Sequence, residues 1–312
     1  MVSPNLGEHP SHYVVRDLVT ELTRQGGVQQ NRSTGPTVGR ILARTRMPLG
    51  LRTRGRRSAP IVVPMMGAQF GLLYSAAVSG AVVPYCWDVW EPQWDLWVRR
   101  LRPLRPPVVF TTASQSARFL ARALPASRVI HLPEATEVAR HDPQRPLVAR
   151  TIGVLELGRR YQMWHDIVRA AVPEDAPRCH VYERPGRRLV FPDESALRRG
   201  LSNTVVSACF PSSMTHPQRA GSVQTLTHRY LESMASGCLL VGHAPPELVR
   251  LMGFNPVVEV DWRAPAEQIL DILHAPHRWQ PHVDRALERL REVGDWSMRV
   301  RAIRAALDVD GA

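Results

Sequence analysis

A single carboxylate, Glu232, stands inside a stretch that otherwise predicts a buried helix followed by a short apolar strand. The stretch Thr227–Leu248 has the sequence THRYLESMASGCLLVGHAPPEL, and a polar loop, residues 211–222, comes before it. A helix that begins near Thr225 after such a loop directs its free N–H groups and the positive end of its dipole into a cleft. Thr225 and Thr227 are therefore candidates for capping this helix or contacting a phosphate group.

Glu232 lies five residues after Thr227, which places it between one and two turns further along the helix. A carboxylate at that depth is suited to accept hydrogen bonds from hydroxyl groups, for instance those of a ribose. The alternative is an ordinary helix in which Glu232 is solvated or pairs with Arg229. Because Leu231 and Met234 are expected to face the core, a ligand site is the favoured interpretation.

The stretch RYLESMASGCLLVG, residues 229–242, resembles the nucleotide-binding signature of retaining GT-B glycosyltransferases of the E-x7-E type, the group 1 or family 4-like enzymes. Glu232 matches the second Glu of that signature, which in the family binds the ribose of a sugar nucleotide. Arg229 fits the subfamily pattern R-x-x-E-x-x-x-S-G-x-L-x-V-G. The resemblance thus implies a donor-binding role for both residues.

The same signature departs from the family on its N-terminal side. Gln224 stands where the family has the first Glu, which touches the donor sugar, and Thr225-Leu226-Thr227 replaces the usual Gly-Phe-Gly. By position, the resemblance implies that Gln224, Thr225, Leu226 and Thr227 contact the donor. The glutamine leaves open whether the protein is catalytically active.

A second stretch, IGVLELGRRYQMWHD (residues 152–166), resembles the family's strand-G-R-x4-K segment, whose Arg and Lys neutralise the diphosphate leaving group. Arg160 takes the place of that Arg, with Arg159 as the alternative in register, and both follow Gly158. His165 stands where the Lys would be. A histidine donates to phosphate but is fully charged only below its pKa. The alternative is that both arginines are surface charges after a strand.

Residues on the acceptor side must come from the first half of the chain. By the resemblance to GT-B enzymes, the polar loop NLGEHPSH, residues 5–12, is expected to face the diphosphate and the acceptor across the cleft. Gly7 would allow close backbone approach, and Glu8, His9 and His12 are candidate hydrogen-bonding groups or bases. A solvated loop is the alternative. Only Met1–Ser3 precede Pro4-Asn5-Leu6-Gly7, where a doubly wound domain normally has a full strand, so we expect either a very short first strand or a true start that lies upstream.

An aromatic segment, YCWDVWEPQWDLW (residues 85–97), resembles the H-D-x-W-P loop of many relatives, with Trp87-Asp88 in place of His-Asp. Asp88 and Glu91 are expected to face the acceptor, and Trp87 or Trp90 to stack on a sugar or lipid. Core packing is the alternative, and it is favoured for Trp94 and Trp97. A weaker resemblance, VIHLPEATE (residues 129–137) to V-x-x-I-P-N-G-V-D, indicates the end of a first domain.

Alternating apolar strands and amphipathic helices surround these motifs. Buried strands that alternate with helices predict parallel, doubly wound sheets. We expect an α/β protein with two Rossmann-like domains facing a cleft (GT-B), an acceptor-side domain at residues 1–140 and a nucleotide-sugar-binding domain at 141–312. The expected strands are Pro60–Met66, Ala81–Cys86, Val108–Thr112, Arg128–Leu132, Thr151–Leu157, Cys179–Tyr182, Arg188–Phe191, Thr204–Phe210, Cys238–Gly242 and Pro256–Val260, and the first helix is Tyr13–Arg24.

The chain is strongly basic, with a net charge of +12 over 312 residues and arginine as its only basic residue besides histidine. Eight arginines fall in Arg32–Arg57, which has no acid. Nucleic acid, an anionic membrane surface or a phosphorylated substrate would fit this segment, and so would a solvated basic loop. The four scattered cysteines favour free thiols in a reducing cytoplasm.

Together, these patterns predict a glycosyltransferase that moves a sugar from a nucleoside-diphosphate sugar to an unidentified acceptor with retention of configuration. No cofactor or metal is expected, since H-x-x-x-H, C-x-x-C and a D-x-D in a short loop are absent. A polysaccharide, lipid-linked or natural-product acceptor is compatible, and nucleic acid is not expected. A silent sugar-nucleotide-binding module and a basic nucleic-acid-binding protein are the alternatives. The expected location is the cytoplasm, with peripheral contact to the inner membrane face through Arg32–Arg57 left open.

Overall fold

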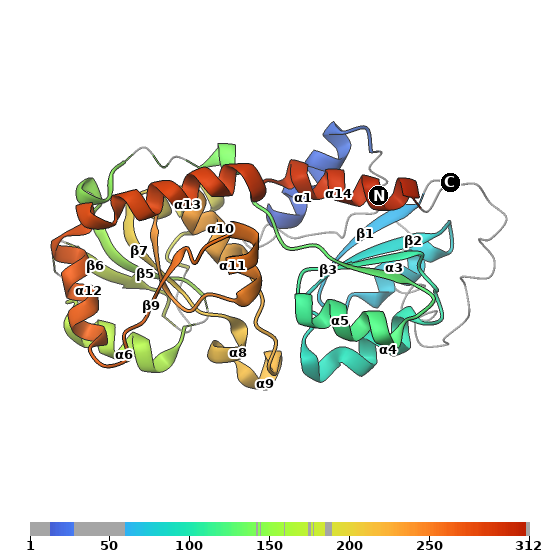
Figure 1. Cartoon of the computed structure of the whole chain (residues 1–312), viewed down its shortest axis with the longest axis horizontal. Coiled ribbons are helices and arrows are strands. Elements are labelled where there is room, and N and C mark those ends of the chain that lie inside the picture. The colour runs from blue at the N-terminus through green and yellow to red at the C-terminus, as the bar shows by residue number, and fades with distance from the viewer. Residues whose placement is uncertain are drawn as a thin grey trace.

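A computed structural model describes residues 13–27 and 60–309 apart from 142, 144, 159, 174, 175, 177 and 185–188. The chain forms two α/β halves, each built around one sheet (Figure 1). The strand orders are β1-β2-β3-β4 and β6-β5-β7-β8-β9, and neighbouring strands pair in parallel. The predicted α/β fold with two parallel sheets facing a cleft is confirmed.

The first half contains a sheet of short apolar strands. Strands β1 (IVVPMM) and β2 (VVPYCW) are almost wholly buried, as expected for parallel strands covered on both faces. The elements of this half are α1 (Tyr13–Arg24), β1 (Ile61–Met66), α3 (Phe70–Ala77), β2 (Val82–Trp87), η3 (Glu91–Gln93), α4 (Trp94–Leu101), β3 (Val108–Thr111), α5 (Ser114–Ala123) and β4 (Arg128–His131). Two short 3₁₀ turns, η4 (Val138–Arg140) and η5 (Leu147–Ala149), lie in the connection that follows.

The second half repeats the strand–helix alternation. Its strands are β5 (Ile152–Glu156), β6 (Cys179–Tyr182), β7 (Thr204–Cys209), β8 (Leu239–Gly242) and β9 (Val257–Glu259). Its helices are α6 (Gln162–Ala171), α7 (Glu194–Ser202), α8 (Ser212–Thr215), α9 (Pro217–Ala220), α10 (His228–Ala235), α11 (Pro246–Met252), α12 (Pro265–His274), η6 (Pro276–Trp279), α13 (Gln280–Val293) and α14 (Trp296–Val309).

One predicted strand, Arg188–Phe191, is wrong over its described part. Residues 189–191 form a bend that leads into α7, not a strand. The ring of Phe191 packs so closely against Gly200 of α7 that a Cβ there would clash with it. Phe191 therefore packs against the core from a loop. The apolar residues of this loop have the composition of a short buried strand, which explains the wrong prediction.

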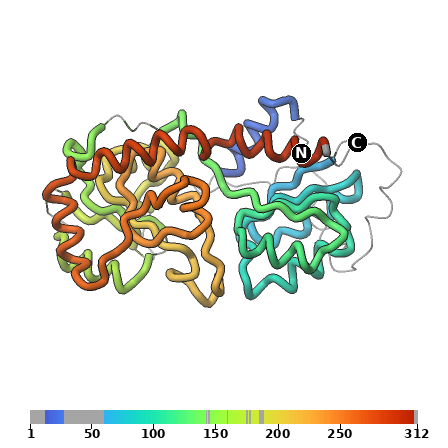
Figure 2. The backbone as a smooth tube through the Cα atoms, viewed as in Figure 1, coloured from blue at the N-terminus to red at the C-terminus, as the bar shows by residue number. Residues whose placement is uncertain are grey.

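The last helix returns to the first half of the molecule. Figures 1 and 2 show α14 leaving the second half and running beside α1. Trp296, Val300 and Ile303 share a buried cluster with Leu18 of α1, and the Arg299 guanidinium donates to the carbonyl of Pro133 at 2.9 Å. The C-terminal residues thus hold the two halves together, while the boundaries 1–140 and 141–312 remain a prediction.

Within the described ranges, no helix has the length and apolar content that crossing a bilayer requires. The four cysteines are free, as expected, and three of them (Cys86, Cys209 and Cys238) are buried. The basic segment Arg32–Arg57 and the loop at residues 5–12 lie outside the described residues.

Candidate active site

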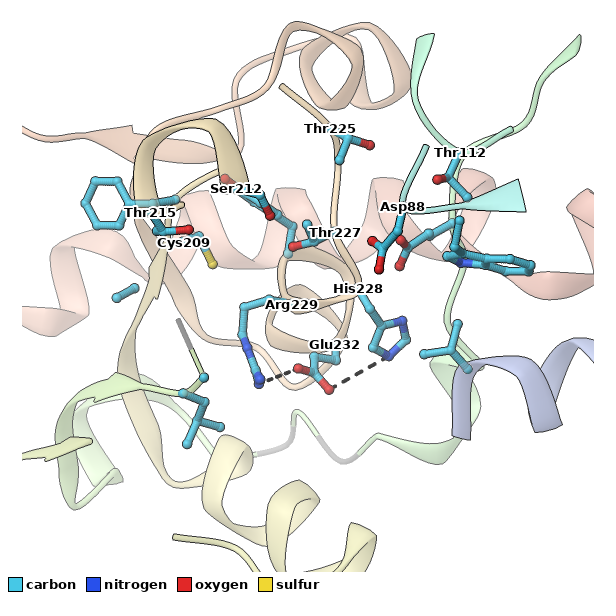
Figure 3. A pocket seen from close by; sticks show the side chains of 18 of the residues that line it. Asp88, Thr112, Cys209, Ser212, Thr215, Thr225, Thr227, His228, Arg229 and Glu232 are labelled. Atoms are coloured by element: carbon cyan, nitrogen blue, oxygen red, sulfur yellow. Dashed lines mark ion pairs between the residues drawn. The ribbon is translucent and has the colours of Figure 1, made fainter. Parts of the chain in front are cut away.

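A cavity of about 490 Å³ lies between the two sheets, where strands of both halves end. The first half contributes residues that follow β2 and β3, and the second half contributes residues that follow β5 and β7. Helix α10 closes one side with its first two turns (Figure 3). The carboxyl ends of parallel strands are where open α/β sheets bind ligands, so the topology alone marks this cavity as the candidate site.

Glu232 is at the centre of the polar groups on α10. It is only 2% exposed and still lines the cavity. One carboxylate oxygen, Oε1, pairs with Arg229, and the other accepts from the Tyr13 hydroxyl of α1 and lies 3.8 Å from His228 Nε2 (Figure 3). A carboxylate has about four acceptor positions, so these contacts leave capacity for further hydroxyl donors. The pairing with Arg229 and a ligand-binding role are therefore compatible.

Tyr13 and His228 are both held in their neutral forms beside this carboxylate. Burial, followed by the charge of Glu232, raises the pKa of the Tyr13 hydroxyl well above its usual value. Burial, followed by Arg229, lowers the pKa of His228 to about 3. Their rings meet edge to face at 4.8 Å. Sequence reasoning took Tyr13 only as the first residue of an amphipathic helix, and no motif marked it as a cavity residue.

Four residues of the loop before α10 were expected to contact the sugar-nucleotide donor, and two of them lie on the cavity wall. Thr225 and Thr227 line the cavity, and the Thr227 side chain makes no capping hydrogen bond. Leu226 and Gln224 are not among the lining residues. Leu226 is fully buried in a hydrophobic cluster, and the Gln224 backbone N–H donates to Gln115 Oε1 of α5 at 2.7 Å. The hydrogen bond to Gln115 therefore connects this loop to the first half.

The segment after β5 places Gly158 and Arg160 at the cavity. Gly158 has a φ of 71° and its N–H donates to Glu183 Oε2 at 2.9 Å. The Arg160 guanidinium donates from Nη2 to the Glu183 carbonyl, and its Nη1 lies 2.9 Å from Nε2 of His165. Arg159, the alternative in register, lies outside the described residues.

His165 does not reach the cavity, although its position was predicted to contact the diphosphate. It is 1% exposed, in the first turns of α6, and does not line the cavity. Its Nδ1 lies 3.1 Å from Glu156 Oε2, and His180 Nε2 lies 3.2 Å from the other oxygen of the same carboxylate. Three ligand-type atoms of Glu156, His165 and His180 fall within 4.8 Å of one another, so this buried group is the candidate metal site of the described chain.

The first half contributes Asp88, Trp87 and Trp90 to the cavity wall. Asp88 follows β2 directly and has a φ of 57°, and its carboxylate pairs with Arg219 of α9 at 3.1 Å. Trp87 and Trp90 are 3% and 2% exposed, so they are part of the core as well as of the wall. Glu91, which was expected to face the acceptor, instead accepts the backbone N–H of Ser222.

The other aromatic residues of this segment are structural. Trp97 is fully buried in the core of the first half, as predicted. Trp94 stacks on Phe119 with ring centroids 4.5 Å apart and donates from its indole to Val89 and Ser116. The candidate residues Gly7 and His9 lie outside the described residues.

Glu134 is a cavity residue that sequence reasoning missed. It follows β4, lines the cavity and accepts the backbone N–H of His228 at the start of α10. Burial raises its pKa well above the usual value, and the charges of Asp88, Glu247 and Glu232 act in the same direction. The signal in the sequence is its position in VIHLPEATE, where Glu134 replaces the Asn of the pattern V-x-x-I-P-N-G-V-D, a stretch that by resemblance indicates only a domain boundary.

No family model and no curated protein matches the chain. Solved structures do resemble it, at 10–14% sequence identity. Anabaena HepE in complex with UDP has a TM-score of 0.60 at 11% identity and covers 99% of this chain and 98% of its own. An α-glucosyltransferase in complex with UDP and a 13-mer DNA containing an HMU base has a TM-score of 0.58 at 11% identity, covering 98% of both chains.

The sucrose-phosphate synthase of Thermosynechococcus elongatus is a further match, with a TM-score of 0.54 at 14% identity over 78% of this chain and 72% of its own. These proteins are GT-B glycosyltransferases, and at such low identity the likeness concerns the fold. The chain therefore has the fold of the GT-B glycosyltransferases.

Proposed function

We propose that this protein is a glycosyltransferase that uses a nucleoside-diphosphate sugar as donor. The observation that carries the proposal is that a buried acid, Glu232, and an arginine, Arg160, both line one cavity at the carboxyl ends of parallel strands. In the proposed complex, Glu232 accepts from the ribose hydroxyls and Arg160 binds the diphosphate. The cavity volume of about 490 Å³ is within the range of small-molecule sites.

The chemistry follows from where charge develops. Breaking the bond between the sugar and the diphosphate leaves negative charge on the phosphate oxygens, while the sugar becomes oxocarbenium-like. Arg160 and the N-terminal N–H groups of α10 would stabilise that charge in an environment with little water. In this proposal the acceptor is contacted by Asp88 and Glu134, which line the cavity from the other half. Retention of configuration and independence of metal ions are part of the proposal by resemblance.

Uridine diphosphate is the first nucleotide to test, because HepE and the α-glucosyltransferase were both solved with UDP. The acceptor is left open. The DNA in the α-glucosyltransferase complex and the basic composition of this chain make an anionic polymer one candidate acceptor class, beside the polysaccharide, lipid-linked and natural-product classes. A peripheral membrane contact through Arg32–Arg57 also belongs to the proposal.

A catalytically silent nucleotide-binding module is the second candidate. Gln224 replaces the acid of the resembled signature and does not line the cavity. In addition, Tyr13, Arg229 and His228 already surround the Glu232 carboxylate. A donor would have to displace or share these contacts, so binding without turnover is consistent with the site.

The test measures the rise in melting temperature on adding UDP, GDP or TDP to the wild type, Glu232→Gln and Glu232→Ala. We expect a nucleotide-induced rise in the wild type that is lost in both variants, whatever their own stability. Glu288→Ala, an exposed acid on α13, is the matched control and should keep the rise. Absence of any rise in the wild type with all three nucleotides would refute the nucleotide site. Hydrolysis of a panel of sugar nucleotides then separates the enzyme from the silent module.

A further inference from the structure

We propose that Glu156, His165 and His180 form a buried hydrogen-bonded chain that fixes the direction of Arg160, so that His165 is a positioning residue and not a phosphate ligand. This inference rests on the proposed function, because it assigns the diphosphate to Arg160. It assigns new roles to two residues, Glu156 and His180, that no motif marked. The evidence is the order of hydrogen-bond donors and acceptors from Arg160 through His165 and Glu156 to His180.

The arginine determines the proton positions. A guanidinium has five N–H donors and no acceptor, so Nε2 of His165, 2.9 Å from Arg160 Nη1, must accept. The proton of the neutral His165 is then on Nδ1, which donates to Glu156 Oε2 at 3.1 Å. His180 Nε2 donates to the remaining oxygen of Glu156 at 3.2 Å. Every link has one donor and one acceptor.

Burial and charge keep His165 in the neutral form that this order requires. Burial lowers its pKa, Arg160 and His180 act in the same direction, and Glu156 opposes them. The groups that face its ring are Glu156 from β5, His180 and Tyr182 from β6, and Arg160 from the loop before α6. A protonated His165 would present an N–H to the guanidinium and lose the link.

These hydrogen bonds restrain the side chain of Arg160, which has many rotamers when it is free. Arg160 is held by His165, by the carbonyl of Glu183, and by the face of the Tyr182 ring, whose centroid is 5.3 Å from its Cζ. Arginine loses about 2 kcal/mol of rotamer entropy when it is fixed, so paying that cost before the ligand arrives favours binding. The donors not used in these contacts are then available on the cavity side.

The same three residues have the ligand types of a metal site, and the proton order distinguishes the two uses. A cation on Nδ1 of His165 would have to remove its proton, and the ring would then need a proton on Nε2. With its proton on Nε2, the ring would direct an N–H at the N–H of Arg160 and could not accept from it. A divalent cation would also lie near a guanidinium, which is electrostatically unfavourable. The arrangement therefore favours the hydrogen-bonded chain.

Two substitutions at position 165 separate the links. His165→Gln places an amide oxygen near Nε2 and keeps an acceptor for Arg160. His165→Asn places its amide near Nδ1, so it keeps a donor for Glu156 but does not reach Arg160. We expect His165→Asn to weaken UDP binding about tenfold, the effect of one lost charge-assisted hydrogen bond, and His165→Gln to stay within about threefold of the wild type. Isothermal calorimetry with UDP and UMP measures both.

A double-mutant cycle tests whether His165 acts through Arg160. Arg160→Ala should weaken UDP binding by about thirtyfold or more and UMP binding much less, because UMP lacks the second phosphate. In the Arg160→Ala background, His165→Asn should cause no further loss. If His165→Asn does not fold, Glu156→Gln serves in the same cycle, since its amide N–H₂ would face an N–H of one of the two histidines.

The outcomes separate this inference from the function on which it rests. No UDP binding by the wild type would refute the nucleotide site itself. UDP binding that depends on Arg160 but is unchanged by His165→Asn, or a His165→Asn loss that persists in Arg160→Ala, would overturn the positioning role and leave the proposed function intact. One tightly held Zn²⁺ per chain that is lost in His180→Asn would overturn the hydrogen-bonded chain in favour of a metal site.

Discussion

Glu247 and Glu134 both join the two halves of the molecule, but their surroundings have opposite effects on the charge they carry. Glu247, in the first turn of α11, is 3% exposed. Its two oxygens accept from the backbone N–H groups of Ser114 and Leu226 and from the Thr225 hydroxyl, and His131 lies 3.4 Å away. Ser114 and His131 belong to the first half. Hydrogen bonds from His131, Ser114 and Leu226 lower the pKa of Glu247 despite its burial.

Glu134 faces the same cleft, and among the described residues it accepts from one backbone N–H, that of His228. Burial raises its pKa well above the usual value, and the negative charges of Asp88, Glu247 and Glu232 act in the same direction. A buried acid supplied with donors on both oxygens is a structural contact, while an undersupplied acid on a cavity wall is typical of a functional site. The comparison thus identifies Glu247 as a contact between the two halves and Glu134 as a further candidate site residue on the cavity wall.

The largest effect is expected for Glu247→Ala. The change leaves the buried N–H of Leu226 and the Thr225 hydroxyl without their acceptor and removes the contacts to the first half. Losing a buried charged hydrogen-bond partner costs about 3 kcal/mol of unfolding free energy. Urea unfolding of Glu247→Ala and of the exposed control Glu267→Ala measures it. A loss under about 1 kcal/mol would contradict the role of Glu247 as an interdomain connection.

The pH dependence of Glu247 gives a second measurement of the same contact. Because its pKa is lower in the folded state, its contribution to stability is present above the unfolded value and is lost as pH falls through the folded pKa. Glu247→Gln should therefore lose less stability than the wild type when pH is lowered through the acid range. If the two proteins lose equal stability at low pH, the hydrogen bonds to Glu247 do not lower its pKa in the folded state, and the prediction is wrong.

A smaller effect of the opposite sign is expected for Glu134→Gln. Because the folded pKa of Glu134 is raised, the folded state binds the proton more tightly, so stability is present below the ordinary glutamate value of 4.5 and is lost as pH rises toward the folded pKa. The amide resembles the protonated acid and carries no charge. We expect Glu134→Gln to exceed the wild type in stability at neutral to alkaline pH, by on the order of 1 kcal/mol. Thermal unfolding across pH tests this, and no gain at any pH would refute it.

The parallel α/β architecture could be predicted because it depends on local pattern. Buried apolar strands such as TVVSAC and IVVPMM alternate with amphipathic helices, and this pattern predicts parallel sheets that are covered on both faces. The helix Tyr13–Arg24 has the predicted bounds because its apolar spacing is regular. The strand expected near Phe191 failed because a short apolar run does not distinguish a strand from a loop residue that packs into the core.

The site could be predicted only where a single segment determines it. Arg160, Arg229 and Glu232 reach the cavity because each lies at or near a strand end or a helix start. Glu134 and Tyr13 could not be found in this way, because their proximity to α10 arises from contacts between segments more than 90 positions apart. His165 shows the converse, since its spacing from Arg160 was recognised but its burial behind the arginine depends on Glu156 and β6.

The smallest effect is expected at the pair between Asp88 and Arg219, whose side chains are 34% and 51% exposed. Surface pairs of this kind contribute about 0.2–1 kcal/mol, so Arg219→Gln should change the unfolding free energy little at pH 5. With Arg219 gone, however, the charge of Asp88 is less compensated and should raise the pKa of Glu134 further. The stability cost of Arg219→Gln should then grow as pH rises and disappear in the Glu134→Gln background. A cost that is independent of pH, or that persists beside Gln at position 134, would show that Glu134 does not sense the charge of Asp88.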